Sequence, residues 1–317
     1  MGEFDLIKRY FTRATPGALL GVGDDAALLQ AGAGNVLAVS SDMLVSGTHF
    51  LPDADPFLLG HKALAVNLSD MAAMGAVPRW ATLAIALPES DEDWLTRFSA
   101  GFFALAQQHG VELVGGDTTR GPLNLCVTII GEAPAQQALR RNGARLDDDV
   151  WVSGCLGDAA LALAHLQGRI ALSGAELASC LPDLHQPQPR VALGLALRGI
   201  ASSAIDVSDG LLADLGHILE ASQVGAEIEF AALPLSPALQ GHMPLPLARQ
   251  CAMCGGDDYE LCFTAPAACR AELAEIAARL GLPLTRIGKI VAGNGCIVRD
   301  AVGNPLNIEV CGYDHFR

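Results

Sequence analysis

The stretch Val36-Leu-Ala-Val-Ser-Ser-Asp42 is a short apolar run that ends in two hydroxyls and a carboxylate, and a helical pattern over Pro56–Met74 follows it. Short runs rich in Val predict strands, whereas apolar residues spaced three or four apart predict helices. Both patterns recur along the chain. An all-α or all-β fold is therefore excluded, and the sequence predicts a protein built from both element types.

The same two patterns divide the rest of the chain into elements. The predicted strands are Val36–Ser41, Thr82–Leu87, Val111–Val114, Leu123–Ile130, Val150–Ser153, Ser203–Val207, Glu227–Phe230, Tyr259–Phe263, Leu284–Val291 and Cys296–Arg299. The predicted helices are Pro56–Met74, Asp91–Gln108, Asp158–Leu166, Pro189–Arg198, Asp209–Ser222 and Pro266–Leu280. Apolar periodicity is lost over Ala133–Asp149, where charge gathers. We therefore expect an amino-terminal domain at 1–138 and a carboxy-terminal domain at 139–317.

The charge balance excludes one class of partner. The 317 residues carry 20 Lys and Arg against 35 Asp and Glu, a net charge of −15. A phosphate backbone would be repelled, so no nucleic-acid partner is expected. Of the 35 acids 22 are Asp, a residue that favours caps, turns and metal sites over helix interiors.

No membrane span and no export signal are expected. The longest charge-free run, Phe230–Ala248, is interrupted by four prolines, which excludes a spanning helix. The first ten residues carry acids and lack an apolar core of signal-peptide length. A cytoplasmic location is the resulting prediction.

Many of the aspartates lie beside Gly or Ser in short turns, most of them at the ends of predicted strands. Six such turns occur: Gly21–Asp25, Ser40–Asp42, Ser69–Asp70, Gly115–Thr119, Asp206–Gly210 and Gly255–Asp258. Any one of them is an ordinary turn or cap. Converging carboxylates, however, would repel one another unless cations lay between them, and oxygen donors are the ligands that Mg²⁺ takes. The set therefore suggests several metal ions holding a polyphosphate.

Two common phosphate-binding motifs are absent from the sequence. Gly288-Lys289 is followed by Ile and lacks the upstream glycine of a Walker loop, and Gly21-Val-Gly23 has no third glycine. A nucleotide would have to be held in another way.

Three single residues each allow two interpretations. His49 follows a predicted strand beside Gly and Thr, and it belongs either to a binding site or to an ordinary turn. Arg140 and Arg141 form either a solvated pair or a clamp for a phosphate group.

Read in order, the turns resemble the thiamine-monophosphate kinase family, whose superfamily also holds aminoimidazole ribonucleotide synthetase, selenophosphate synthetase and a hydrogenase-maturation protein. The residues that carry the resemblance are Gly21–Ala26, Ser41-Asp-Met-Leu-Val-Ser-Gly-Thr-His-Phe50, Lys62-Ala-Leu-Ala-Val-Asn-Leu-Ser-Asp-Met-Ala-Ala-Met-Gly-Ala76, Gly115–Arg120, Ala204-Ile-Asp-Val-Ser-Asp-Gly-Leu211, Gly255-Gly-Asp-Asp-Tyr-Glu-Leu261 and Gly312–Phe316. The second, third and fifth of these are long enough to be specific.

The resemblance implies a fold and an activity. The expected fold is α+β in two domains of the aminoimidazole ribonucleotide synthetase type, with an amino-terminal domain that forms a β-barrel across a homodimer and a mixed α/β carboxy-terminal domain. The expected activity is transfer of the γ-phosphoryl group of ATP onto thiamine monophosphate, the final step of thiamine diphosphate biosynthesis.

The resemblance also implies the residues of the site. The family's Mg²⁺ shell falls on Asp25, Ser40, Ser41, Asp42, Asp70, Asp117, Asp206 and Asp209. The family's ATP contacts fall on Gly116, Asp117, Arg141 and Ser208. Its contacts with thiamine monophosphate fall on His49, Asp257 and Tyr313. The acceptor phosphate is already ionised, so no general base is expected, and Asp42, Asp70 and Asp117 are the central carboxylates of the expected metal-mediated reaction.

One position departs from the family pattern. The family usually shows Gly-Gly-Glu-Asp-Tyr-Glu, whereas this chain has Asp257 in place of the Glu. The Asp side chain is shorter, so it is open whether its carboxylate reaches the substrate.

Three alternative functions are weighed against the one that the resemblance implies. Selenophosphate synthetase would need a reactive Cys near the amino terminus, and the first cysteine here is Cys126. Aminoimidazole ribonucleotide synthetase should lack the long Ser41–Phe50 and Lys62–Ala76 strings. A non-catalytic sensor of Mg²⁺ and nucleotide is the alternative from another class.

Overall fold

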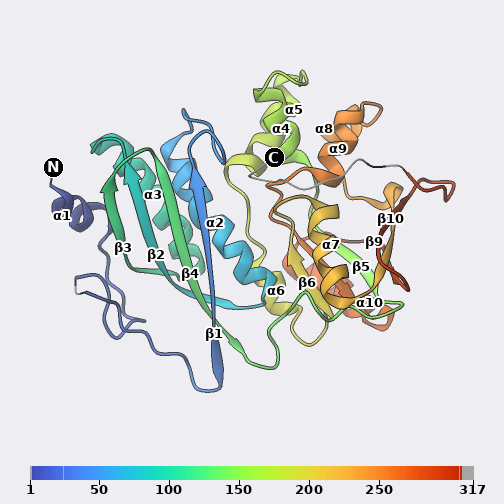
Figure 1. Ribbon diagram of the computed structural model, residues 1–317, viewed down its shortest axis with the longest axis horizontal. Helices are drawn as coiled ribbons and strands as arrows, with labels where there is room; N and C mark the ends of the chain where they lie inside the picture. The colour runs from blue at the N-terminus through green and yellow to red at the C-terminus, as the bar shows by residue number, and fades with distance from the viewer. Residues whose placement is uncertain (1, 24, 307, 309–317) are drawn as a thin grey trace. The chain divides into compact units, whose positions relative to one another are not determined.

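The computed structural model describes residues 2–23, 25–306 and 308, and the chain forms two compact units. The first unit comprises Met1–Met71 and Ala76–Gln136, and the second comprises Ala72–Gly75 and Gln137–Arg317. Each unit contains one β-sheet and its own helices (Figure 1). The expected α+β fold in two domains is confirmed.

The first unit is built on a four-stranded sheet in the order β1-β4-β2-β3. Its strands are β1 (Asn35–Val45), β2 (Val77–Leu87), β3 (Glu112–Arg120) and β4 (Asn124–Pro134). Strand β4 pairs antiparallel with β1 and β2, and β3 pairs parallel with β2. The sheet remains open in the described chain, with β1 and β3 at its edges, so no closed barrel is seen within one copy.

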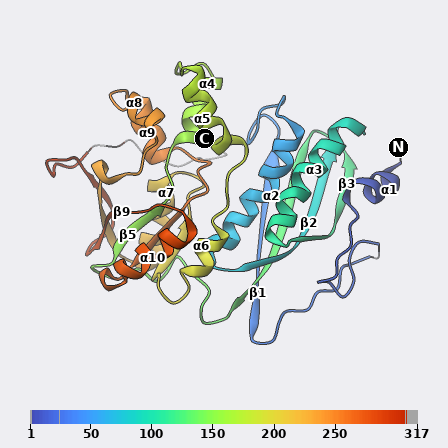
Figure 2. The same ribbon diagram turned by 180° about the vertical axis from the view of Figure 1, so that it is seen from behind.

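Two long helices cover one face of this sheet, as the views from front and back show (Figures 1 and 2). They are α2 (Pro56–Ala73) and α3 (Glu92–His109). Leu125, Val127 and Ile129 of β4 are buried on the covered face, whereas the residues between them are half-exposed. This alternation is what a sheet with one packed face requires.

Helices α2 and α3 approach each other closely at two glycines. A Cβ built on Gly60 would lie 2.1 Å from the carbonyl oxygen of Phe98, and one built on Gly101 would lie 1.9 Å from that of Phe57. Each helix thus contacts the backbone of the other, with the buried Phe98 and Phe102 beside the crossing. Larger side chains at these two positions would push the helices apart.

The other face of the sheet carries exposed apolar side chains. Val39 and Met43 of β1 are 63% and 56% exposed. Their register partners Ile130 and Cys126 on β4 are half-exposed. Apolar side chains standing together on one face suggest an interaction surface.

A short amino-terminal segment packs on helix α3. It forms α1 (Glu3–Leu6) and the π-helix η1 (Ile7–Phe11). The ring of Phe11 meets that of Phe98 edge to face at 6.4 Å, and the guanidinium of Arg9 donates to Glu92 at 2.8 Å.

The second unit contains a six-stranded sheet in the order β10-β7-β9-β5-β8-β6. The strands are β5 (Asp149–Ser153), β6 (Ser203–Asp206), β7 (Gly225–Glu229), β8 (Leu261–Ala265), β9 (Leu284–Val291) and β10 (Gly295–Arg299). All pairs are antiparallel except β7 with β10, which is parallel.

Helices lie on both faces of this sheet, with α7 in front in Figure 1 and α10 in front in Figure 2. The helices are α4 (Asp158–Leu166), α5 (Gly174–His185), α6 (Val191–Ala196), α7 (Leu211–Ser222), α8 (Pro237–His242), α9 (Pro246–Cys254) and α10 (Arg270–Leu280), with 3₁₀ turns at Phe230–Ala232 and Ala267–Cys269. Val150 and Val152 join the core beneath α7, whereas Trp151 between them stacks on Phe263 on the other face. Among the described residues, none of the helices combines the length with the apolar character that a bilayer-spanning segment requires.

Replacing Gly101 by alanine should lower the unfolding midpoint, although alanine is the better helix former. The added Cβ would overlap the carbonyl of Phe57, and forcing the helices apart should cost about 2–4 kcal/mol. Gly216→Ala in α7 is the matched control, because a Cβ there meets nothing within 4 Å. The control should raise stability by about 0.5–1 kcal/mol in the same calorimetric scan. Equal midpoints for the two variants would contradict the close crossing.

Candidate active site

The first group of candidate residues lies where β1 meets helix α2. Ser40 Oγ donates a hydrogen bond of 2.6 Å to Asp70 Oδ2. Side chains alternate along a strand, so Asp42 points to the same face of the sheet as Ser40. The strand and the helix therefore place one hydroxyl and two carboxylates on the helix-covered side of β1, and these are oxygen donors of the kind that Mg²⁺ prefers.

Ser41 lies between these residues and its side chain points to the other face. Its hydroxyl forms a hydrogen bond of 2.6 Å with Oγ1 of Thr128 on β4. The side chain of Ser41 thus interacts with the neighbouring strand, apart from the side chains of Ser40 and Asp42.

Gly116 and Asp117 lie on β3, at the opposite edge of the same sheet. Asp42 on β1 pairs with Val127 on β4, which pairs with Leu83 on β2, and Leu83 pairs with Gly116 on β3. Three strand spacings, about 14 Å, therefore separate Asp42 from Gly116. Gly116 has φ +151°, and a Cβ there would lie 1.9 Å from the carbonyl oxygen of Leu83. Glycine is required at this point, and Asp117 follows it as an exposed side chain.

His49 lies in a tight turn that follows β1. The amide of Val45 donates to His49 Nδ1 at 3.0 Å, and the amide of His49 donates to the carbonyl of Val45 at 2.9 Å. Because Nδ1 is an acceptor, the neutral ring carries its proton on Nε2. Asp25 lies in a separate, exposed turn of the amino-terminal segment.

In the second unit, strand β6 ends at the buried Asp206, and the loop Val207–Gly210 leads into helix α7. Asp214 on the helix turns back onto this loop, where its Oδ2 accepts the amides of Ser208 and Asp209 at 3.0 Å each. Burial, with the charges of Asp206 and Asp209, raises the pKa of Asp214 to about 7. Carboxylates with little access to water are thus gathered at the start of α7.

The loop 255–260 lies directly against this one. The amide of Asp257 donates to the carbonyl of Ser208 at 2.9 Å, and the amide of Tyr259 donates to that of Val207 at 2.8 Å. Asp257 and Tyr259 have backbone φ angles of 69° and 50°, which residues other than glycine rarely adopt. The hydroxyl of Tyr259 donates to Asp257 Oδ1 at 3.0 Å. Backbone strain in two non-glycine residues is typical of a functional loop.

The end of loop 255–260 is fixed by a buried ion pair. Arg190 donates through Nε to Glu260 Oε2 at 2.7 Å and through Nη2 to Oε1, and Ser153 Oγ donates to the same carboxylate. Glu260 is 5% exposed. A carboxylate buried to this degree is stable only when it is paired and hydrogen-bonded, and here both conditions are met.

Further carboxylates lie around helix α4. Both oxygens of Asp258 accept the amide of Gly157 at the start of α4, at 2.8 and 3.0 Å. Burial raises the pKa of Asp258 well above its usual value, and burial together with the charges of Asp158 and Glu260 raises the pKa of Asp183 to about 6. The negative charges of Asp158 and Glu260 disfavour ionisation of both Asp183 and Asp258. The positive charge of Arg190 favours ionisation of Asp183.

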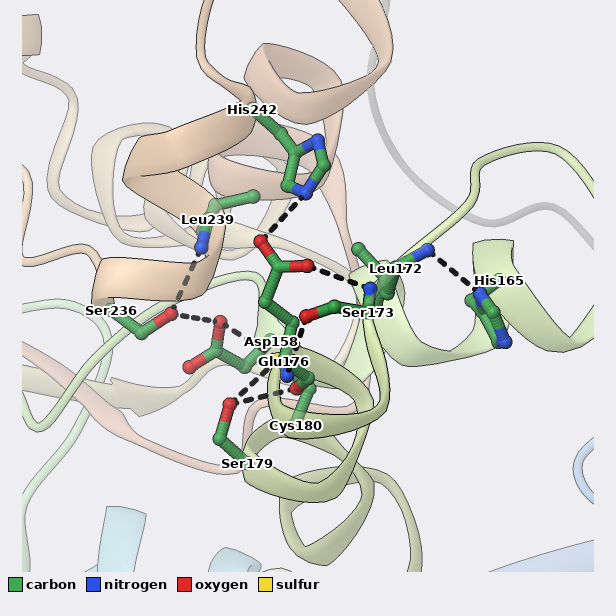
Figure 3. Close-up of polar contacts among 10 residues, drawn as sticks. All are labelled: Asp158, His165, Leu172, Ser173, Glu176, Ser179, Cys180, Ser236, Leu239 and His242. Carbon is green, nitrogen blue, oxygen red and sulfur yellow. Dashed lines mark hydrogen bonds and ion pairs between the residues drawn. The ribbon is translucent and has the colours of Figure 1, made fainter.

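Polar contacts tie α4, α5 and α8 together (Figure 3). Ser236 Oγ donates to Asp158 Oδ1 at 2.6 Å and also accepts the amide of Leu239 in the first turn of α8. His242 Nε2 lies 3.1 Å from Glu176 Oε1, and His165 Nδ1 accepts the amide of Leu172. These bonds cap α8, join α8 to α4 and α5, or tie the loop before α5 to α4, so each has a structural role.

The remaining candidates are Arg141 and Tyr313. The carbonyl of Arg141 accepts the hydroxyl of Ser222 at 2.9 Å, and its side chain is exposed. Tyr313 lies outside the described residues. Within residues 2–23, 25–306 and 308, no three His, Cys, Asp or Glu side chains form a group that could hold a metal ion.

Sequence reasoning missed the residues that hold these loops. Asp214, Glu260, Arg190 and Ser153 were not among the candidates. Glu260 lies within the Gly255–Leu261 string and Asp214 lies four residues after Gly210, so proximity to a motif was the available signal. Ser153 and Arg190 carry no local signal, because their partner lies 107 and 70 residues away.

Comparison with known families gives two matches along the chain. The AIR synthase related protein, N-terminal domain, matches residues 23–133, and the C-terminal domain of the same protein type matches residues 148–301.

Individual relatives are similar over nearly the whole length. The thiamine-monophosphate kinase of Escherichia coli strain K12 is 50% identical over 99% of this chain and 98% of its own. The crystal structure of thiamine-monophosphate kinase from Stenotrophomonas maltophilia K279a is 54% identical, with a TM-score of 0.87 over 94% of this chain and 96% of that one. A structure of AaThiL complexed with AMPPCP and TMP is 32% identical, with a TM-score of 0.78 over 99% and 97% of the two chains. On this full-length similarity in sequence and fold, the chain belongs to the thiamine-monophosphate kinase family of AIR synthase related proteins.

Proposed function

We propose that this chain transfers the γ-phosphoryl group of ATP directly onto the phosphate of thiamine monophosphate, giving thiamine diphosphate and ADP. The observation that carries the proposal is the 50% identity to a thiamine-monophosphate kinase over 99% of the chain. The AaThiL structure solved with AMPPCP and TMP supports the same pair of substrates. The cytoplasmic location inferred from the sequence stays a prediction.

Mg²⁺ is the proposed cofactor, and the chemistry of the donor set fits it. Ser40, Asp42 and Asp70 offer hydroxyl and carboxylate oxygens on one side of β1, and Asp206 and Asp209 offer carboxylates in the second unit. Asp25, Ser41 and Asp117 complete the metal-binding set proposed from the family resemblance, although the side chain of Ser41 faces the other side of the sheet from those of Ser40 and Asp42. Bound Mg²⁺ would offset the negative charge of the phosphates that have to meet.

The substrate contacts are proposed on the remaining candidates. Gly116, Asp117, Arg141 and Ser208 would meet ATP. His49 would donate from Nε2 to an anionic oxygen, because its Nδ1 is taken by the Val45 amide. Asp257 and Tyr313 would meet thiamine monophosphate. The acceptor phosphate is ionised at neutral pH, so these residues orient it for in-line attack and no residue has to remove a proton.

A homodimer formed through the first unit is also proposed. The face of the β1-β4-β2-β3 sheet away from α2 and α3 exposes Val39 and Met43. A second copy that closed the two sheets into a β-barrel would cover these side chains and leave neither β1 nor β3 as an open edge.

The proposed activity predicts ADP release that depends on thiamine monophosphate. Purified protein incubated with ATP and Mg²⁺ should release ADP at the basal rate of hydrolysis. Addition of thiamine monophosphate should stimulate ADP release, and the additional ADP should be matched by an equimolar amount of thiamine diphosphate. Chromatographic separation of the products measures both. Stimulation by another phosphate acceptor alone would favour a different enzyme of the superfamily. Nucleotide binding with no ADP under any condition would indicate a sensor.

Asp42→Asn should abolish turnover while leaving the fold intact. The amide keeps the shape of the side chain but loses the charge that the proposed metal contact needs, so kcat should fall by about two orders of magnitude or more. Asp93→Asn, at an exposed position in the first turn of α3, should keep the kcat of the unmodified chain. A kcat for Asp42→Asn close to that of the control would remove Asp42 from the metal set.

Tyr259→Phe should raise the KM for thiamine monophosphate severalfold and change kcat little. Only the hydroxyl that donates to Asp257 is lost, so the carboxylate that the substrate would meet loses one of its hydrogen bonds. Tyr10→Phe is the matched control, since Tyr10 is also buried and its hydroxyl donates to the carbonyl of Glu92. Steady-state kinetics with thiamine monophosphate varied at saturating ATP measure the effect. Equal KM values in the two variants would refute the role of the Tyr259 hydroxyl.

A further inference from the structure

Asp214 makes an unusual arrangement with the loop that precedes its own helix. It lies in the first turn of α7, is 3% exposed, and a single oxygen, Oδ2, accepts the amides of both Ser208 and Asp209. The residue at the start of the helix, Gly210, has no side chain to cap it. The Asp214 carboxylate therefore accepts backbone amides ahead of the helix, as a capping side chain does at other helices, although Asp214 itself lies within the helix.

Placing a carboxylate here is unfavourable by itself. Burial removes it from water, and Asp206 and Asp209 are nearby acids whose charges repel it. A capping side chain could not stand at Gly210 instead, because this residue has φ +110° and a Cβ there would lie 2.6 Å from the backbone of Cys254. The amides of Ser208 and Asp209 therefore depend on Asp214 as their acceptor, in spite of its unfavourable burial.

The loop that Asp214 holds is fixed on both sides. The amide of Ser208 donates to Asp214, and the carbonyl of Ser208 accepts the amide of Asp257. The amide of Asp209 also donates to Asp214, so the peptide group that joins Ser208 to Asp209 has one orientation. Ser208 and Asp209 thus occupy defined positions, although their own side chains reach the surface.

We propose that Asp214 is a positioning residue, which holds Ser208 and Asp209 in the geometry that binds Mg²⁺-bound nucleotide. The inference rests on the proposed function, because that function gives Ser208 and Asp209 their ligands. The role of Asp214 is indirect: it contacts the backbone of the two residues. A displacement of about 1 Å in such a loop can change affinity or rate by up to about a hundredfold.

Three substitutions at this position test the proposal. Asp214→Ala removes the acceptor, and Asp214→Glu keeps the charge but moves the acceptor by one methylene. Both should weaken binding of ADP with Mg²⁺ by about tenfold or more in a calorimetric titration, and both should raise the KM for ATP. Asp214→Asn keeps one oxygen where Oδ2 lies, and it should recover most of the affinity lost in Asp214→Ala.

Asp91→Ala is the matched control. Asp91 Oδ1 also accepts two backbone amides, those of Asp93 and Trp94, at the start of α3. Its loss should lower the unfolding midpoint and leave the affinity for ADP unchanged. If the Asp214 variants behave like this control, Asp214 serves stability only and the proposal is overturned.

The outcome stays interpretable if Asp214→Ala does not fold. In that case Asp214→Glu decides: affinity equal to that of the unmodified chain overturns the proposal, and a loss of affinity with an unchanged midpoint supports it. Failure of the proposed function would be seen separately, as ADP release without dependence on thiamine monophosphate in the unmodified chain. Binding of ADP with Mg²⁺ would still report on Asp214 in that event.

Discussion

The ion pair between Glu260 and Arg190 is the interaction on which the second unit's site depends. A carboxylate that is 5% exposed would be strongly destabilising without a partner, and here the guanidinium contacts both of its oxygens while Ser153 donates to one. The carbonyl of Glu260 also accepts the amide of Val207. Glu260 therefore joins the end of β5, the start of α6, the end of β6 and the start of β8. The loop carrying Asp209 begins at this fixed point, and the loop carrying Asp257 ends there.

The acidic side chains of the protein fall into two groups with different physical roles. Asp214, Asp258 and Glu260 accept backbone or side-chain donors inside the second unit and hold loops in place. Asp117 and Asp209 are exposed and lie where glycine or a neighbouring loop fixes the backbone. The net charge of −15 thus combines carboxylates that are satisfied within the fold with carboxylates that face the solvent and are proposed to meet cations. Neither group alone would build the proposed kinase site, because the exposed carboxylates need a rigid backbone.

Local sequence patterns predicted most of the elements, and the helices that they missed include three that contain or begin with a proline. All ten predicted strands form, and α4 has the predicted bounds Asp158–Leu166, because apolar periodicity is a property of neighbouring residues. Helix α5 contains Pro182 in its interior and was not predicted, although the capping box of Ser173 and Glu176 marks its start. Helices α8 and α9 begin at Pro237 and Pro246, prolines that the sequence analysis treated as interruptions; at the first position of a helix a proline is compatible with helical geometry.

The sequence by itself determined the element types, the positions of the acidic turns and, through its long motifs, the family. These follow from residues that are close together in the chain. Only the tertiary structure decided which carboxylates are structural and which are exposed, that Ser40 bonds to Asp70 while Ser41 faces the other side, and that Asp42 and Asp117 lie on opposite edges of one sheet. These features depend on contacts between residues 30 to 107 positions apart, and the free energy of such contacts comes from packing, burial and strand order, none of which a local pattern contains.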